Sequence, residues 1–174
     1  MTYTRNDGNV CSKDEARTPP EIYNKLDAEF HFDLDVACTR DNCLSRNHYG
    51  YTKDDNALVQ DWTKFMMDNG EEATIFFVNP PYSNGNILRF VHTAYCEASK
   101  GATAVLLIPA DISTEYFDFC FSNASEIRFM HPRVKFNNPD GTPMKGSPQM
   151  GSMIVVFGPM GSEHTKYSIW KWKE

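Results

Sequence analysis

The sequence of 174 residues lacks long hydrophobic runs. No stretch approaches the 18 or more apolar residues that a membrane-spanning helix needs. The first eight residues, MTYTRNDG, contain no apolar core of the kind that signal peptides carry. We therefore expect no contact with a membrane and a location in the cytoplasm.

The cysteines lack the close pairs that mark most zinc sites. The five positions are Cys11, Cys38, Cys43, Cys96 and Cys120, an odd number without a Cys-x2-Cys pair. Cys38 and Cys43 come near His31 and His48 in the sequence, but no second pair follows at a usual distance. We expect thiols in a reducing compartment and no metal.

The sequence also lacks an excess of positive charge. It has 17 basic and 23 acidic residues, for a net charge of −6, which argues against a protein that coats nucleic acid without specificity. A small basic face could still bind DNA. With 41% hydrophobic residues, the chain can form one real core. We expect a loose arm over residues 1–16, one domain over 17–160 and a tail over 161–174.

Apolar segments of strand and helix type alternate through the middle of the chain. Residues 75–78 and 102–108 are continuous apolar runs typical of buried strands, and residues 87–99 carry apolar side chains at helical spacing. A strand, a helix and a second strand in this order predict a parallel crossover. Nearer the start of the chain, Thr18 and Glu21 predict a helix with a capped N-terminus. The fold class is therefore α/β, with a mostly parallel sheet and helices on both faces.

An unusual stretch follows the first buried strand directly: Asn79-Pro80-Pro81-Tyr82. The two prolines prevent further strand or helix, so Asn79 and Tyr82 are held at the carboxyl end of a strand, where open α/β sheets bind ligands. The Asn79 oxygen and the Pro80 carbonyl can both accept hydrogen bonds from one NH2 group, and Tyr82 can stack on the ring that carries it. The plainer interpretation is a proline-rich turn capped by Asn79.

An acidic residue ends an earlier predicted strand. The segment 30–38 alternates and then becomes apolar, so we expect a strand that ends near Asp35 or Val36. The Asp35 carboxylate could reach a ligand while Ala37 allows close approach of the backbone. A simple capping role for Asp35 remains an equal alternative.

The most basic window comes late in the chain, with Arg128, Arg133 and Lys135. Such a window on a surface loop could contact DNA, although most short basic windows are only solvated surface.

The Asn79–Tyr82 stretch resembles motif IV of amino-methyltransferases that use S-adenosylmethionine (SAM). An ordered set resembles the phage-type (Dam-like) DNA N6-adenine methyltransferases over residues 17–158: Thr18-Pro19-Pro20, residues 32–37, Asn42, Leu58, Asp61-Trp62 and Asn79–Tyr82. The resemblance implies a Rossmann-like SAM-dependent fold with one antiparallel strand near the C-terminal edge. The usual Gly-x-Gly after the first strand is missing here, as it is in the phage-type family.

The resemblance also implies functional residues, with SAM as cofactor and double-stranded DNA as partner. An adenine would flip out of the duplex and attack the SAM methyl group directly, without a metal. The catalytic residues are then Asn79, Pro80, Pro81 and Tyr82. The cofactor-binding residues are Thr18, Pro19, Asp35, Ala37, Cys38, Asp55 and Asn56. The DNA-binding residues are Ser83, Asn84, Arg128, Arg133, Lys135 and Phe136.

Two other classes of function fit the same residues. The Asn79 site could methylate another amino group, on cytosine N4, RNA adenine or a protein glutamine. Alternatively, the chain could be a degenerate, non-enzymatic DNA-binding protein of the same fold. The sequence does not indicate the target word, the oligomeric state, or whether methylation serves protection from restriction or regulation.

Overall fold

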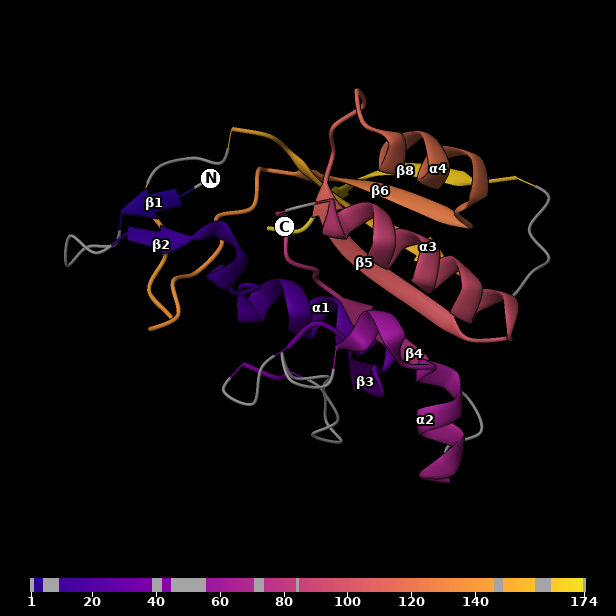
Figure 1. The fold of residues 1–174 in the computed structure, drawn as a ribbon. Coiled ribbons are helices and arrows are strands. Elements are labelled where there is room, and N and C mark those ends of the chain that lie inside the picture. The colour runs from indigo at the N-terminus through magenta and orange to yellow at the C-terminus, as the bar shows by residue number, and fades with distance from the viewer. Residues whose placement is uncertain are drawn as a thin grey trace.

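The computed structural model shows an α/β protein built on a mixed six-stranded sheet (Figure 1). In sheet order, the strands are β3 (Leu34–Asp35), β4 (Ile75–Val78), β5 (Thr103–Pro109), β7 (Ser152–Phe157), β6 (Glu126–His131) and β8 (Lys166–Lys171). The structure describes residues 2–4, 10–38, 42–44, 56–70, 74–83, 85–145, 149–158 and 164–173.

Strand pairing confirms the predicted α/β class and shows a mixed sheet. The pairs β3–β4, β4–β5 and β6–β8 are parallel. Strand β7 lies between β5 and β6 and is antiparallel to both. The predicted crossover is present, because helix α3 (Asn86–Ser99) connects the parallel strands β4 and β5.

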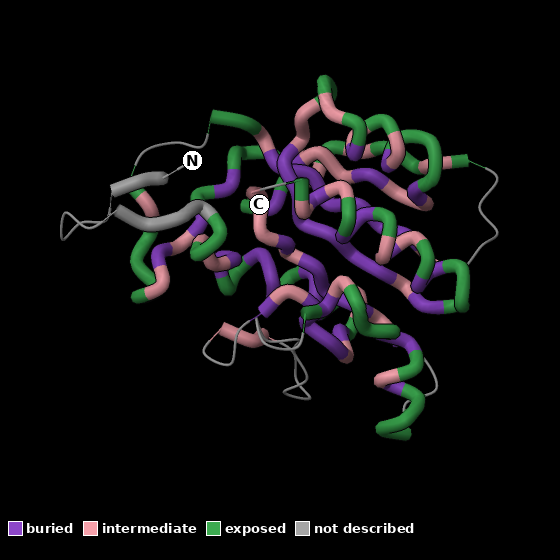
Figure 2. Tube along the Cα trace, in the orientation of Figure 1, coloured by how far each residue is buried: buried purple, intermediate pink, exposed green. Residues whose placement is uncertain are grey.

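The helices pack on both faces of the sheet. Helix α1 (Pro20–Phe30) buries Ile22 and Leu26 in the same cluster as Phe77 of β4. On the other face, α2 (Trp62–Asp68), α3 and α4 (Glu115–Asn123) pack in a second cluster with Phe76. Neighbouring residues of β4 thus point to opposite faces, as the pleat requires. Both faces are covered, so β4 and β5 run through the buried middle of the molecule (Figure 2).

The start of α1 differs from the predicted capping box. The helix begins at Pro20, with Pro19 at the N-cap position, one residue later than expected. The Thr18 hydroxyl instead accepts a hydrogen bond from the Asn79 side chain, at 3.0 Å. The capping role was wrong because this tertiary contact takes the hydroxyl.

The described residues near both ends of the chain include strands. Strands β1 (Thr2–Thr4) and β2 (Val10–Ser12) pair antiparallel within the expected loose arm, and η1 (Lys13–Glu15) follows. Strand β8 belongs to the main sheet, so the expected tail contributes one edge of it. Among the described residues, no helix has the length and apolar character needed to cross a membrane.

Candidate active site

Asn79 lies just beyond the carboxyl end of β4, and its side-chain amide is held at both ends. The amide nitrogen donates to the Thr18 hydroxyl at 3.0 Å. The amide oxygen accepts from the Tyr82 hydroxyl at 3.1 Å. In this arrangement the amide nitrogen faces the Thr18 hydroxyl and the amide oxygen faces the Tyr82 hydroxyl. The Asn79 oxygen has a second lone pair that can accept a further hydrogen bond.

Tyr82 is part of the support for Asn79. The Leu107 carbonyl of β5 lies 3.2 Å from the same hydroxyl, so the single Tyr82 proton is shared between this carbonyl and the Asn79 oxygen. The Tyr82 ring packs edge-on against Phe136 with centroids 6.1 Å apart. Burial raises the pKa of the Tyr82 hydroxyl far above its ordinary value. The phenol therefore keeps its proton and serves as a hydrogen-bond donor. Pro80, between Asn79 and Tyr82, is buried, and Pro81 is half-buried.

The segment before α1 connects the Asn79 loop to a second loop. Asp14 accepts hydrogen bonds from both the backbone N–H (3.1 Å) and the hydroxyl of Ser83. Arg17 and Asn137 exchange two backbone hydrogen bonds of 2.9 Å each. Residues 14–18 therefore position the loop after β4 and the loop after β6 together. Asp14 was not among the predicted site residues, because a single acidic residue in a polar segment gives no signal.

A cavity of about 230 Å³ opens beside Asn79. Three of the predicted cofactor-binding residues, Thr18, Asp35 and Ala37, line it together with Asn79. The structure thus brings together residues that are more than 60 positions apart in the chain. Other residues that line the cavity were not predicted to bind a ligand, and they include Arg17, Asn42, Cys43, Leu44, Asn137 and Gly141.

Asp35 brings a buried carboxyl group to this cavity. It ends β3 and is paired in register with Phe77 of β4, so Asp35 and Asn79 lie at the same edge of the sheet. Burial raises the pKa of the Asp35 carboxyl to about 7, and the nearby Cys43 thiol adds to this rise. The N–H of Leu44, which donates to the carboxyl at 3.1 Å, opposes it. A carboxyl group with so little water around it favours a ligand that donates hydrogen bonds or carries positive charge.

The other predicted cofactor-binding residues occupy different positions. Pro19 is buried at the start of α1, and its carbonyl accepts from Ile22 and Tyr23. Cys38 is buried beside Asp35. Asn56 is exposed at the start of η2 (Ala57–Val59) and does not line the cavity. Asp55 lies outside the described residues.

Arg128, one of the predicted DNA-binding residues, is engaged elsewhere. Its guanidinium forms a bidentate pair with Glu29 at 2.5 and 2.6 Å, bonds Glu126 at 3.0 Å and lies 5.3 Å from the Phe30 ring centroid. These pairs raise the pKa of Arg128 above its ordinary value. Glu29 is in the last turn of α1, and nine residues of helix place it roughly 14 Å from the end at Pro20. The structure therefore does not bring Arg128 to the cavity.

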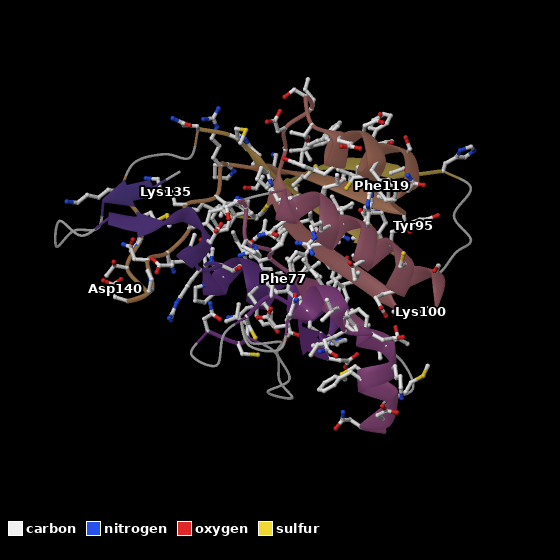
Figure 3. All side chains as sticks on the ribbon, in the orientation of Figure 1. Phe77, Tyr95, Lys100, Phe119, Lys135 and Asp140 are labelled. Atoms are coloured by element: carbon white, nitrogen blue, oxygen red, sulfur yellow. The ribbon has the colours of Figure 1, made fainter. Side chains whose placement is uncertain are left out.

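Two of the other predicted DNA-binding residues, Ser83 and Phe136, lie next to Tyr82. Ser83 follows Tyr82 directly, and Phe136 is buried against the Tyr82 ring. Arg133 and Lys135 are exposed on the same segment as Phe136. Lys135 points outward at the end of the molecule that carries β1 and β2, far from Tyr95 and Phe119 (Figure 3). Asn84 lies outside the described residues.

Comparisons with known proteins agree with this picture. The sequence model of the family described as DNA N-6-adenine-methyltransferase (Dam) matches residues 6–173. A DNA N-6-adenine-methyltransferase of Haemophilus phage HP1 is 31% identical over 171 residues, covering 94% of this chain and 91% of that protein. A second, from Escherichia phage T1, is 31% identical over 111 residues, covering 63% of this chain and 42% of that protein. The chain thus belongs to the Dam family of adenine-specific DNA methyltransferases, the phage-type family that its sequence resembles.

Proposed function

We propose that this protein transfers the methyl group of SAM to the N6 amino group of adenine in double-stranded DNA. One observation carries the proposal: the Asn79 amide is held by Thr18 and Tyr82 at the rim of a cavity that contains the buried Asp35 carboxyl. The arrangement offers an acceptor for an amino group beside a space for a second ligand. The membership of the chain in the Dam family supports the choice of adenine in DNA.

The residues of the cavity fit a SAM molecule in their chemistry. Asp35 would accept hydrogen bonds from an ammonium or hydroxyl group, and Ala37 leaves room for backbone contacts. The carboxyl ends of the parallel strands β3 and β4 meet here, as expected for a Rossmann-like site. Bound SAM supplies an electrophilic methyl group on a sulfonium.

Asn79 and Pro80 would orient the attacking nitrogen. A flipped adenine donates its two amino protons to the Asn79 side-chain oxygen and the Pro80 carbonyl, which directs the nitrogen lone pair towards the methyl group. A nitrogen–carbon bond forms as the carbon–sulfur bond breaks, and the amino group then loses one proton to solvent. Thr18 and Tyr82 hold Asn79 in place before the substrate arrives, so little reorganisation is needed during reaction.

Replacing Asp35 with asparagine should weaken SAM binding by about 10- to 150-fold. A hydrogen bond to a charged group contributes roughly 1.5–3 kcal/mol, and the amide lacks the charge. Isothermal titration calorimetry measures the dissociation constant. Asp118→Asn, an exposed site on α4, is the matched control and should bind SAM like the parent protein. Unchanged affinity in Asp35→Asn would remove Asp35 from the cofactor site.

We propose that Arg133 and Lys135 contact DNA phosphates next to the Tyr82–Phe136 pair, with Ser83 and Asn84 on the adjoining loop. Arg128 is left out of this surface because two carboxylates already pair with it. The double variant Arg133→Ala/Lys135→Ala should weaken DNA binding and reduce the slope of log K against log salt by about 0.9 for each phosphate that the variant no longer neutralises.

Fluorescence anisotropy over a series of salt concentrations measures this slope. Lys64→Ala is the matched control, because Lys64 is an exposed residue of α2 whose partner is Asp68. A double variant with the parent slope would place the DNA elsewhere.

The decisive test of the function is methyl transfer from labelled SAM to unmethylated DNA, followed by mass spectrometry of the nucleosides. We expect N6-methyladenine. N4-methylcytosine would keep the Asn79 chemistry and overturn the base. SAM binding without label in DNA would favour an RNA or protein substrate, and loss of both would favour a degenerate fold.

A further inference from the structure

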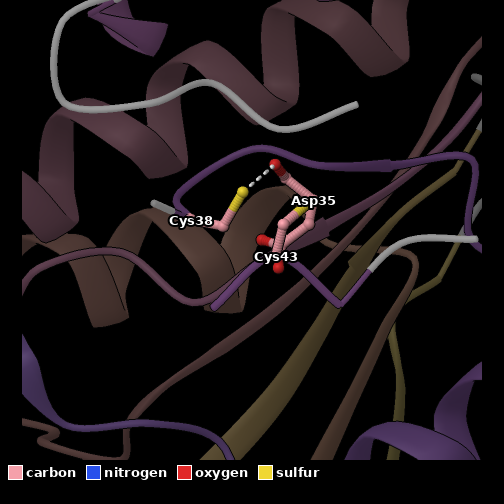
Figure 4. A group of neighbouring side chains, drawn as sticks. All are labelled: Asp35, Cys38 and Cys43. Atoms are coloured by element: carbon pink, nitrogen blue, oxygen red, sulfur yellow. Dashed lines mark hydrogen bonds between the residues drawn. The ribbon is translucent and has the colours of Figure 1, made fainter. Parts of the chain in front are cut away.

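Three side chains lie close together beside the cavity, and the proposed methyl transfer does not require their grouping. The Asp35 carboxyl oxygen and the sulfur atoms of Cys38 and Cys43 lie within 4.8 Å of one another (Figure 4). Asp35 and Cys38 are buried and Cys43 is half-buried. The four cysteines whose side chains the structure describes are thiols and form no disulfide, and the Cys38 sulfur donates to the Asp35 backbone carbonyl at 3.5 Å. We call these three residues the Asp35 trio.

We propose that the Asp35 trio binds a thiophilic divalent cation such as Zn²⁺ and that this ion excludes SAM from the cavity. Sulfur ligands select zinc over magnesium or calcium, and a carboxylate oxygen is an accepted third ligand. Each thiol loses its proton to solvent as it ligates the ion. The inference rests on the proposed function in one respect, namely that this cavity is the SAM site.

The geometry requires little movement. Zinc lies about 2.3 Å from sulfur and about 2.0–2.2 Å from oxygen, so the ligand atoms of a tetrahedral site are roughly 3.3–3.8 Å apart. From a separation of at most 4.8 Å, the Asp35 trio therefore needs to contract by only about 1 Å. A disulfide between the two cysteines would need a much closer approach, to about 2.05 Å. An ion can therefore bridge the sulfurs with less distortion than a covalent bond.

The position of the trio explains the expected competition. Asp35 and Cys43 both line the cavity, and Asp35 is the residue that we expect to bind SAM. Three protein ligands leave a fourth position of a tetrahedral ion for water. An ion bound by the Asp35 trio uses the Asp35 carboxylate and occupies the part of the cavity next to it. SAM and the ion therefore cannot bind at the same time. The sequence indicated Cys38 and Cys43 as possible ligands beside His31 and His48, but it gave no sign that Asp35 would join them, because Asp35 completes no cysteine motif.

The test is a titration of the SAM-free, full-length protein with Cd²⁺, a spectroscopic substitute for zinc that gives an ultraviolet charge-transfer band with thiolates. We expect one ion per chain in the parent protein and loss of the band in Cys38→Ser and in Cys43→Ser. Cys96→Ser, at an exposed cysteine of α3, is the matched control and should keep the band. Competition with a coloured chelator then gives the Zn²⁺ affinity.

Each serine variant should lower the Zn²⁺ affinity by more than the roughly 10- to 100-fold that loss of an outer-shell partner costs. Asp35→Asn should keep the band but bind the ion more weakly. Equal bands in all variants, or loss of the band in Cys96→Ser alone, would show that the Asp35 trio does not bind the ion. Circular dichroism of each variant separates loss of a ligand from loss of the fold.

The competition has its own measurement. Saturating Zn²⁺ should weaken SAM binding, SAM should weaken Zn²⁺ binding by the same factor, and a chelator should restore SAM binding. Independent binding of the two would overturn the exclusion. A chain that binds Cd²⁺ at the trio but binds no SAM would support the metal site and contradict the proposed function. A chain that methylates DNA but gives no cysteine-dependent band would support the proposed function and contradict the metal site.

Discussion

Replacing Asn79 with alanine should lower kcat for methyl transfer at least ~10²–10³-fold, the usual cost of removing one preorganised hydrogen-bonding group. Alanine removes the oxygen that we propose accepts from the adenine amino group and leaves the Thr18 and Tyr82 hydroxyls without their shared partner. SAM binding should change little, because Asp35 and Ala37 remain in place. Single-turnover transfer of labelled methyl groups to DNA measures the rate.

The control for this experiment is Asn123→Ala. Asn123 is exposed at the end of α4, where its amide donates to the Phe119 carbonyl, so the substitution removes the same group far from the cavity. Its kcat should match the parent value. A rate in Asn79→Ala close to that of the control would refute direct attack at this site. A loss of SAM binding equal to the loss of rate would instead make Asn79 a cofactor residue.

Replacing Trp62 with alanine should reduce the free energy of unfolding by about 3–5 kcal/mol, the range found for large aromatic residues in cores. Trp62 is fully buried at the start of α2. Its ring packs edge-on against Phe76 of β4 at 5.6 Å, and its indole N–H donates to the Ala57 carbonyl at 2.7 Å. Alanine therefore leaves a cavity beneath β4, the strand that ends just before Asn79.

Urea unfolding followed by circular dichroism measures this effect. Met67→Ala provides the comparison, because Met67 is on the same helix with 56% of its surface exposed. Its free energy of unfolding should stay within about 0.5 kcal/mol of the parent value. Equal effects of the two substitutions would show that Trp62 does not support β4. Total stabilities of about 5–15 kcal/mol are usual, so the Trp62 variant should lose a large part of the total.

Local sequence patterns predicted the middle of the fold well. The apolar run of β5 and the helical spacing of α3 are continuous signals, and the structure has a strand and a helix where they occur. The order of the strands could not be predicted in this way. Insertion of β7 between β5 and β6, and the place of β8 at the edge, depend on contacts between distant residues. Strand β8 also alternates only weakly, because much of it is exposed.

In the site, too, residues with a local sequence signature could be predicted, and contacts between distant residues could not. Asn79–Tyr82 has a local signature, a buried strand followed by two prolines, and the structure places it at a strand end beside Thr18 and Asp35. Contacts made through backbone atoms, such as the exchange between Arg17 and Asn137, have no signature in side chains. The role of Thr18 shows the limit clearly. A capping pattern was present, but the hydroxyl bonds a residue 61 positions away.

The position of β7 has a consequence for the order in which the sheet can assemble during synthesis. Strand β6 reaches the rest of the sheet only through β7, and β8 reaches it only through β6. A nascent chain that has emerged as far as residue 145 can pair β3, β4 and β5, but β6 still has no neighbour. Emergence of Ser152–Phe157 then provides a partner for two strands at once. Joining of β6 to β5 therefore waits until Ser152–Phe157 is available, and β8 can complete the sheet only after that.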